Sequence, residues 1–292
     1  MRRGLIINNA YSALASALNQ SLRLKEELAR LGVAADILNG APELFIDGGG
    51  NISAQISGYD FCVYLDKDKY ASRMLEKSGL RLFNSAAAVE ICDDKMSTHI
   101  ALANRGVPMP ETVAGLLCYN PSAELKREFV NGLEKKLGYP LIVKESYGSL
   151  GKGVYKADNR EQLDSLCKKL MCVPHLFQKF IKESAGRDLR VIVVGGRCVA
   201  AMRRVSNGDF RSNLELGGSG NPADICEITQ NLCVRTAEAL GLDYCGIDLL
   251  YGERGMLVCE VNSNAFFGGI EKVTGVNVAA AYAGYIVKEI YK

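Results

Sequence analysis

The chain of 292 residues has few of the side chains on which most catalytic and metal sites depend. It contains only two histidines, His99 and His175, so a zinc site or a Ser-His-Asp triad has little material. Its ten cysteines are scattered through apolar segments and none stands in a CxxC spacing. They are therefore expected to be buried thiols in a reducing cytoplasm, and a redox or metal-storage protein is not supported.

Long apolar runs and clusters of charge are also missing. No stretch approaches the roughly 18 apolar residues of a membrane span, and the apolar run near the N-terminus is too short for a secretion signal. The 35 basic and 33 acidic residues are interspersed, and the net charge is only +2. We therefore expect a soluble cytoplasmic protein without a membrane or nucleic-acid partner.

Apolar strands and helical patterns alternate along the chain, which indicates an α/β fold. Residues 4–92 predict a small parallel sheet, with Asn8 and Asn9 at the carboxyl end of its first strand. Such ends often bind ligands, although the two asparagines could simply turn the chain. We predict three domains, which are an N-terminal α/β domain (1–92), a central subdomain with a glycine-rich loop (93–182) and a C-terminal subdomain with a hairpin (183–292).

The most informative segment, residues 246–264, predicts a β-hairpin with three oxygen ligands. Glu260 and Asn262 are two apart and share one face of a strand, while the turn at 252–255 brings Asp248 opposite them. A plain two-residue loop would set the register one residue off, so the alignment requires a bulged turn. Two carboxylates and an amide suit Mg²⁺. The alternative is an edge hairpin with solvated acids.

A second candidate site is the loop Ser146–Gly153, which follows the predicted strand 141–145. Its glycines at 148, 151 and 153 leave backbone N–H groups free to approach a phosphate closely. The order of the glycines matches neither a P-loop nor the dinucleotide fingerprint. A flexible hairpin turn is the competing interpretation.

Cationic side chains flank both candidate sites. Lys144 lies in an apolar strand and needs a counter-charge, which a phosphate would supply. Lys95 begins a predicted helix and, taken alone, would more often be solvated. Arginines between residues 187 and 211 are typical of surfaces when taken singly, but near a phosphate loop they fit the clamping of a transferring phosphoryl group.

Taken together, these segments resemble the ATP-grasp ligases, and among them the RimK-like group that joins an amino acid, typically glutamate, to a carboxylate. The resemblance spans about residues 85–290 and implies an ATP-grasp fold with an N-terminal pre-ATP-grasp domain. The matching motifs are DK at 94–95, PLIVK at 140–144, the loop at 148–153, Gln178 with 180–181, RDLR at 187–190, DFRSN at 209–213, GID at 246–248, EVN at 260–262 and GIE at 269–271.

The resemblance assigns a role to each group of matching residues. The two lysines would hold the phosphates, the loop would close over them, residues 178–181 would line the adenine, and Asp188 would meet the ribose. The implied ATP-binding residues are Lys95, Lys144, Gly148, Ser149, Gly151, Gly153, Gln178, Lys179, Phe180, Ile181, Asp188, Arg211 and Asn213. Two Mg²⁺ ions, or Mn²⁺ in their place, would bind Asp248, Glu260 and Asn262. Catalytic roles are expected for Arg203, Arg211 and Asn213. From their charge, Arg203 and Arg204 would suit an acidic acceptor.

The implied reaction forms an acyl phosphate that an amine displaces, which needs neither histidine nor cysteine. The acceptor would be a peptide, a protein C-terminus, a carrier protein or a cofactor tail, and relatives often form homo-oligomers. The chain departs from the family pattern at Lys179, where glutamate is usual, and at 264–267, which borders the substrate side. The alternative function is a non-catalytic, ATP-binding regulatory protein of the same fold.

Overall fold

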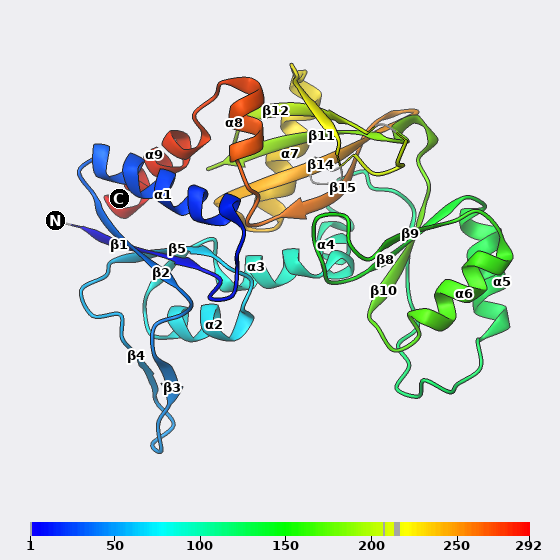
Figure 1. Ribbon diagram of the computed structural model, residues 1–292, viewed down its shortest axis with the longest axis horizontal. Helices are drawn as coiled ribbons and strands as arrows, with labels where there is room; N and C mark the ends of the chain where they lie inside the picture. The colour runs from blue at the N-terminus through cyan, green and yellow to red at the C-terminus, as the bar shows by residue number, and fades with distance from the viewer. Residues whose placement is uncertain (1, 207, 213–216) are drawn as a thin grey trace.

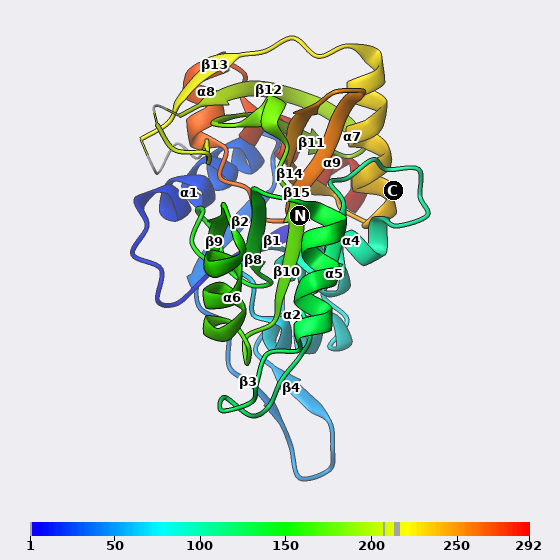
Figure 2. The ribbon, with the colours of Figure 1, turned by 90° about the vertical axis from the view of Figure 1, so that its right-hand side faces the viewer.

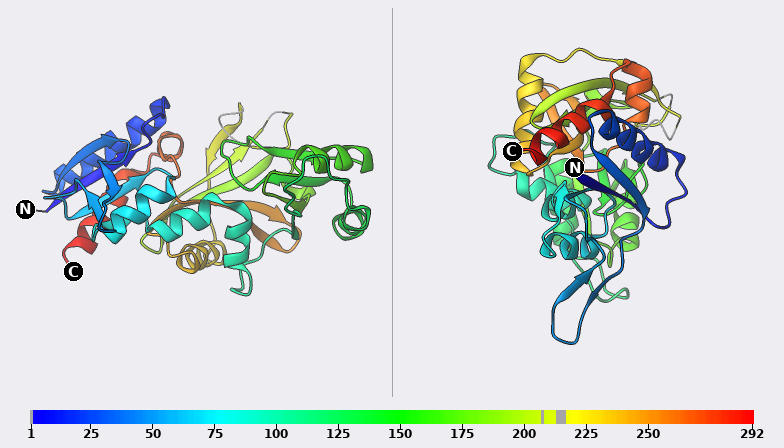
Figure 3. Two further views of the ribbon diagram at one scale, coloured as in Figure 1. Left: turned by 90° about the horizontal axis from the view of Figure 1, so that it is seen from below. Right: turned by 90° about the vertical axis from the view of Figure 1, so that its left-hand side faces the viewer.

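The computed structural model describes residues 2–206, 208–212 and 217–292. Three sheets organise these residues, together with a two-stranded hairpin of β3 (Leu44–Ile46) and β4 (Ile52–Ala54). In Figure 1 the first sheet lies at the left, the third at the upper centre and the second at the right. Figure 3 shows both chain termini at the end of the molecule that carries the first sheet.

The first sheet is parallel throughout, as predicted for residues 4–92. Its strand order is β2 (Ala34–Asn39), β1 (Arg3–Asn8), β5 (Phe61–Leu65) and β6 (Arg81–Phe83). Alternate residues of β1 and β5 are buried on opposite faces, under α1 (Ala15–Arg30) and α9 (Val278–Ile290) on one side and α2 (Lys69–Lys77) and α3 (Ala86–Asp93) on the other. Burial on both faces explains why these strands are continuous apolar runs.

The second sheet is antiparallel, with the order β7 (Thr112–Ala114), β10 (His175–Lys179), β8 (Leu141–Glu145) and β9 (Val154–Ala157). One face packs under α5 (Arg127–Leu137) and α6 (Arg160–Lys169), which lie in front of the strands in Figure 2. Leu141 and Val143 point into this core. Because side chains alternate along a strand, Ile142 and Lys144 face the opposite side, where a cleft opens.

The third sheet is also antiparallel, in the order β13 (Ser219–Pro222), β12 (Arg197–Val205), β11 (Arg187–Val194), β14 (Tyr244–Gly252) and β15 (Gly255–Asn262). A short helix, η1 (Lys182–Ser184), leads into it. The helix α7 (Glu227–Ala239) packs on one face, and α8 (Gly268–Thr274) and α9 pack on the other. Between the first and second sheets runs α4 (Lys95–Leu102).

The first and third sheets share one hydrophobic core, although they belong to different predicted domains. The buried Asn84 links them directly. Its amide nitrogen donates to the carbonyl oxygens of Tyr244 and Ser263, and its side-chain oxygen accepts from the backbone nitrogens of Asp243 and Tyr244. These four bonds hold the end of β6 against the start of the β14–β15 hairpin. The division into three domains stays a prediction.

No helix in residues 2–206, 208–212 and 217–292 combines the length and the apolar composition needed to cross a membrane.

Five of the ten cysteines are buried, but Cys172 and Cys226 are exposed, so the expectation of buried thiols is wrong for these two. Both lie in connections beside helices rather than in a core.

Candidate nucleotide and metal site

The hairpin of β14 and β15 aligns the predicted metal ligands. Asp248 pairs directly with Glu260, and Gly246 pairs with Asn262. The origin of this register differs from the prediction, because the turn is a plain two-residue loop between the paired glycines 252 and 255. The extra residue is Cys259, which forms a bulge within β15 after the Leu249–Val258 pair. The bulge shifts the register by one residue and so places Glu260 opposite Asp248.

Asp248 lies in a network of buried charges. Its two carboxylate oxygens accept from Arg190 at 2.7 and 2.6 Å, and Arg204 Nη2 lies 3.0 Å away. Arg204 also forms a two-point ion pair with Asp188. Burial by itself would raise the pKa of Asp248, but the charges of Arg190 and Arg204 outweigh it and lower the pKa from 3.8 to about 2. The carboxylate is therefore ionised at neutral pH.

Glu260 and Asn262 differ from Asp248 in having no side-chain hydrogen bond or ion pair to any described residue. Both line the same cavity as Asp248. Among the described residues, no three His, Cys, Asp or Glu side chains are grouped for a metal, so a cation at the hairpin would need Asn262 as its third protein ligand. Two carboxylates and one amide oxygen are hard donors that fit Mg²⁺.

The two predicted phosphate lysines are buried without a described carboxylate partner. Lys95 begins α4 directly after its capping residue, Asp94, and its Nζ donates to the carbonyl oxygen of Gly148 at 2.8 Å. Lys144 Nζ lies 3.3 Å from the sulphur of Cys259. Burial raises the pKa of Cys259, so this partner is a neutral thiol at pH 7. Two buried ammonium groups with only neutral partners favour an anionic ligand.

The glycine-rich loop is held from two sides. Lys95 binds the carbonyl oxygen of Gly148, and Arg211 Nη1 donates to that of Gly151 at 2.8 Å. Gly153 closes the loop with a φ of +69°, and a Cβ atom there would lie 3.0 Å from Cδ of Glu145. A side chain at this position would therefore be strained and would collide with β8. The contacts tie the loop to Lys95 and to Arg211.

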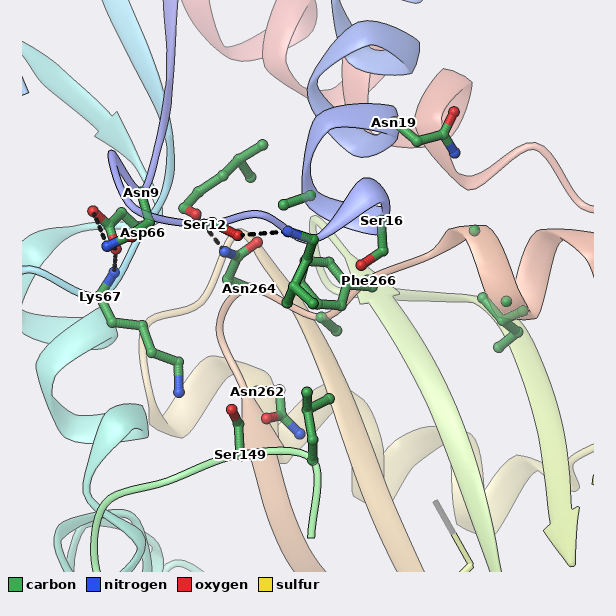
Figure 4. Close-up of a pocket in the computed structure, with 18 of the residues that line it drawn as sticks. Asn9, Ser12, Ser16, Asn19, Asp66, Lys67, Ser149, Asn262, Asn264 and Phe266 are labelled. Carbon is green, nitrogen blue, oxygen red and sulfur yellow. Dashed lines mark hydrogen bonds between the residues drawn. The ribbon is translucent and has the colours of Figure 1, made fainter. Parts of the chain in front are cut away.

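Two cavities meet at the hairpin. The smaller, about 110 Å³, lies between the second and third sheets and is lined by Ile142, Lys144, Val154, Gln178, Phe180 and Leu250, among others. The larger, about 740 Å³, lies between the third sheet, the start of α1 and the ends of β1 and β5, as Figure 4 shows. Asp248, Glu260 and Arg204 line both cavities. A ligand in one would therefore face a ligand in the other across the hairpin.

Most predicted site residues come together here. The smaller cavity is lined by Lys144, Gly151, Gln178, Lys179, Phe180, Ile181, Asp188, Arg211, Asp248 and Glu260, and the larger by Ser149, Asp248, Glu260 and Asn262. Lys95 lies beside Glu260 at the base of the hairpin. Of the two N-terminal asparagines, Asn9 lines the larger cavity, whereas Asn8 is buried against Ser21 and Asn39.

Two predicted positions stand apart. Asn213 lies outside the described residues. Arg203 is exposed and lines neither cavity, while its neighbour Arg204 is buried between Asp188 and Asp248. Consecutive residues of β12 point to opposite faces, so only one of the two can reach the site. Arg190 and Arg204 therefore contact the hairpin through Asp248, whereas Arg203 does not. Only the strand pairing shows which side chains face the hairpin.

Comparison with known proteins agrees with this arrangement. The family model described as the RimK-like ATP-grasp domain matches residues 92–286. This range includes the charged residues that line the two cavities, except Asp66 and Lys67. The chain belongs to the RimK-like ATP-grasp family. The resemblance found in the sequence is thereby confirmed.

Individual relatives of this RimK-like protein carry names of glutamate-joining enzymes. The beta-citrylglutamate synthase B of Danio rerio is 39% identical over 228 residues, which are 77% of this chain and 55% of that protein. A probable alpha-L-glutamate ligase of Xanthomonas oryzae pv. oryzae is 40% identical over 222 residues, which are 75% of this chain and 72% of that protein. The chain spans little more than half the length of the synthase that it matches.

Solved structures confirm the predicted ATP-grasp fold. The ATP-grasp ligase PsnB complexed with a minimal precursor has a TM-score of 0.72 at 19% identity, covering 99% of this chain and 100% of the PsnB chain. The D-alanine–D-alanine ligase of Bacillus anthracis complexed with ATP also has a TM-score of 0.72, at 15% identity, covering 100% of this chain and 98% of that one. At such low identities the likeness shows the fold alone.

Proposed function

We propose that this RimK-like protein is an ATP- and Mg²⁺-dependent, ADP-forming ligase that joins the amine of an amino acid such as glutamate to a carboxylate. One observation carries the proposal, namely that the acidic hairpin lines both the small cleft and the large cavity. A nucleotide in the cleft would direct its phosphates toward an acceptor in the cavity. The names of two relatives, a beta-citrylglutamate synthase and a probable alpha-L-glutamate ligase, support this reaction class.

The residues that line the cleft suit a nucleotide in polarity and charge. Ile142, Val154 and Leu250 provide apolar walls for a planar base, and the segment 178–181 borders it. Lys95 and Lys144 would bind the phosphates, because each ammonium group is buried and lacks a described carboxylate partner. Arg211 would hold the loop closed through its bond to Gly151. Asp188, which also lines this cleft, would contact the ribose.

Asp248, Glu260 and Asn262 are the residues that would hold Mg²⁺. When bound, the metal would supply charge neutralisation for the phosphate oxygens. Arg190 and Arg204 already lie against Asp248 and line the larger cavity, so their positive charge stays beside the acceptor. We propose that two ions bind, a number that metal titration would test.

The reaction follows from these positions. An acceptor carboxylate oxygen attacks the γ-phosphorus of ATP, the bond to ADP breaks, and an acyl phosphate forms. The amine of the amino acid then attacks the acyl carbon, loses a proton, and phosphate leaves. The protein's part is to orient both reactants and to place Lys95, Lys144 and Arg190 where negative charge accumulates, which requires no histidine or cysteine.

The larger cavity indicates the character of the acceptor. Amide and hydroxyl side chains dominate the labelled part of its wall, including Asn9, Ser12, Ser16, Asn19 and Asn264 (Figure 4). A volume of about 740 Å³ accommodates a drug-sized molecule. Neutral hydrogen-bonding groups in this number suit a polar acceptor of the peptide type, alongside the incoming amino acid.

Phosphate release from Mg·ATP tests the proposal. The purified protein would be screened against all amino acids in combination with pools of peptides and small carboxylic acids, with Glu260→Gln as the control that removes one metal-binding carboxylate. We expect release only with a particular amino acid and acceptor, and loss of release in the control. ATP binding without turnover for any pair would contradict the proposal and favour a non-catalytic, ATP-binding regulatory protein.

A further inference from the structure

Gln178 occupies a position in which the orientation of its amide decides what the cleft can recognise. The side chain extends from β10 toward the nucleotide cleft and is only 2% exposed. Its Nε2 lies 3.0 Å from Thr112 Oγ1 and 2.8 Å from His99 Nε2. A glutamine presents two donor hydrogens on one side and an acceptor oxygen on the other, so its two partners determine which end faces the cleft.

Thr112 determines the orientation from one side. Its hydroxyl group donates to the carbonyl oxygen of Pro110 at 2.8 Å, and a carbonyl oxygen can only accept. The single hydroxyl hydrogen is therefore committed to Pro110. Toward Gln178 the same oxygen has only lone pairs, so the atom of Gln178 that faces it must be the NH₂ group.

His99 determines the orientation independently. Its Nδ1 lies 3.1 Å from the sulphur of Met109, which has no hydrogen to donate. Nδ1 therefore carries the ring hydrogen. Burial, aided by the charge of Lys144, lowers the pKa of His99 to about 3, so the ring is neutral at pH 7 and has only this one hydrogen. Nε2 is then an acceptor and also requires the NH₂ group of Gln178.

Both partners thus use the two hydrogens of the Gln178 amide and leave its oxygen directed away from them. We propose that the His99–Gln178–Thr112 network holds the Gln178 Oε1 as a hydrogen-bond acceptor toward the base in the cleft, and that it thereby selects adenine over 6-oxopurines. This inference rests on the proposed function in so far as the cleft binds a nucleotide. It assigns His99 and Thr112 as positioning residues.

The selection follows from the chemistry of the base edge. Adenine carries a donor amino group at C6, whereas hypoxanthine and guanine carry an acceptor oxygen there. A fixed acceptor pairs with the first and repels the second. Lys179, where the family usually has glutamate, offers no acceptor, and its ammonium lies 3.3 Å from Glu111.

The same helix connects this network to the phosphate end of the cleft. His99 and Lys95 are one turn apart on α4, and Lys95 binds the glycine loop through Gly148. Residues four apart lie on the same face of a helix. A single short helix therefore positions a group at each end of the bound nucleotide.

Nucleotide binding measured by calorimetry, with Mg²⁺ present and no acceptor, tests the inference. The probes are ATP, inosine triphosphate and purine riboside triphosphate, which present a donor, an acceptor and a hydrogen at C6. For the wild type we expect purine riboside triphosphate to bind roughly three- to tenfold more weakly than ATP, and inosine triphosphate to bind more weakly still. Inosine triphosphate binding as tightly as purine riboside triphosphate would overturn the inference without any variant.

Two variants test the network itself. Thr112→Val and His99→Leu each remove one partner and free the amide to rotate, so the preference for ATP over inosine triphosphate should fall by roughly tenfold. Thr236→Val is the matched control, because its buried hydroxyl likewise donates to a carbonyl oxygen, that of Leu232, but lies on α7 away from the cleft. The control should keep the wild-type preference.

The outcomes distinguish a failure of the His99–Gln178–Thr112 network from a failure of the proposed function. An unchanged preference in both variants, with ATP still bound, would overturn the network and leave the ligase proposal intact. If the wild type bound none of the three nucleotides, the proposed function would fail and this inference with it. Circular dichroism identifies a variant that has not folded, in which case the wild-type comparison of the three nucleotides decides alone.

Discussion

Replacing Arg204 with methionine tests the buried charge network at the hairpin. The side chain of Arg204 is 3% exposed and lies between two buried carboxylates, with ion pairs to Asp188 and Asp248. Methionine keeps much of the length and apolar volume but removes the cation. Asp248 retains Arg190, whereas Asp188 loses the only ion-pair partner that it has among the described residues.

The expected cost is large for a single substitution. Removing one partner of a buried ion pair leaves an uncompensated charge and typically costs about 3 to 5 kcal/mol. Because a protein of this kind is stabilised by about 5 to 15 kcal/mol, that is a substantial fraction of its stability. Urea unfolding at pH 7 without added metal, followed by circular dichroism, would measure the loss.

Two further variants make the measurement specific. Arg203→Met changes the neighbouring residue of the same strand, which is exposed, and should alter the free energy of unfolding by less than about 0.5 kcal/mol. Asp188→Asn combined with Arg204→Met removes the orphaned charge and should recover part of the loss. Equal effects of the two arginine substitutions, or no recovery in the double variant, would refute the reasoning.

Three other predictions concern single buried side chains. Burial lowers the pKa of His99 to about 3, so as the pH falls the unfolded chain takes up the proton before the folded protein does. The free energy of unfolding should therefore decrease below pH 6.5, by about 2 kcal/mol at pH 5. Urea unfolding at several pH values should show this decrease, and His99→Gln should remove most of it. Lys144→Met removes a buried ammonium without a described carboxylate partner, so the melting temperature should stay or rise while calorimetry shows weaker ATP binding. Asn84→Ala leaves four backbone groups without their bonds and should cost at least about 3 kcal/mol in urea unfolding.

Each of these predictions has a result that contradicts it. Stability that does not change between pH 7 and pH 5, or a slope that persists in His99→Gln, would mean that another group titrates. A marked loss of stability in Lys144→Met would show that the lysine serves the fold rather than an anion. An Asn84→Ala variant as stable as the wild type would mean that water satisfies the exposed backbone groups.

Local sequence patterns accounted for several features of the fold and the site. The alternation of apolar strands and helical patterns in residues 4–92 predicted a small parallel sheet, and that sheet is present. The strand 141–145 was predicted at the bounds that the structure has. Its period of two also places Lys144 on the face opposite Leu141 and Val143, where the cleft lies, while the phosphate expected at Lys144 stays a prediction. These features depend on residues within one element.

Features that depend on pairing between elements could not be obtained in this way. The bulge at Cys259, rather than a bulged turn, sets the register of Asp248 and Glu260. Arg203 and Arg204 are adjacent in sequence, and only the pairing of β12 with β11 shows that Arg204 meets the carboxylates. A shift of one residue in a strand moves every side chain to the other face, so local periodicity cannot decide such cases.

The amino-acid sequence by itself determined the chemical inventory of this protein, which consists of two lysines, an acidic hairpin with an asparagine, and a glycine-rich loop in an order typical of its family. The tertiary structure alone decided which groups meet. His99 and Gln178 are 79 residues apart, and Asn84 lies 160 residues from Tyr244, yet each pair is joined by a buried hydrogen bond. Such contacts arise because packing brings distant elements together, and burial then requires their polar groups to find partners.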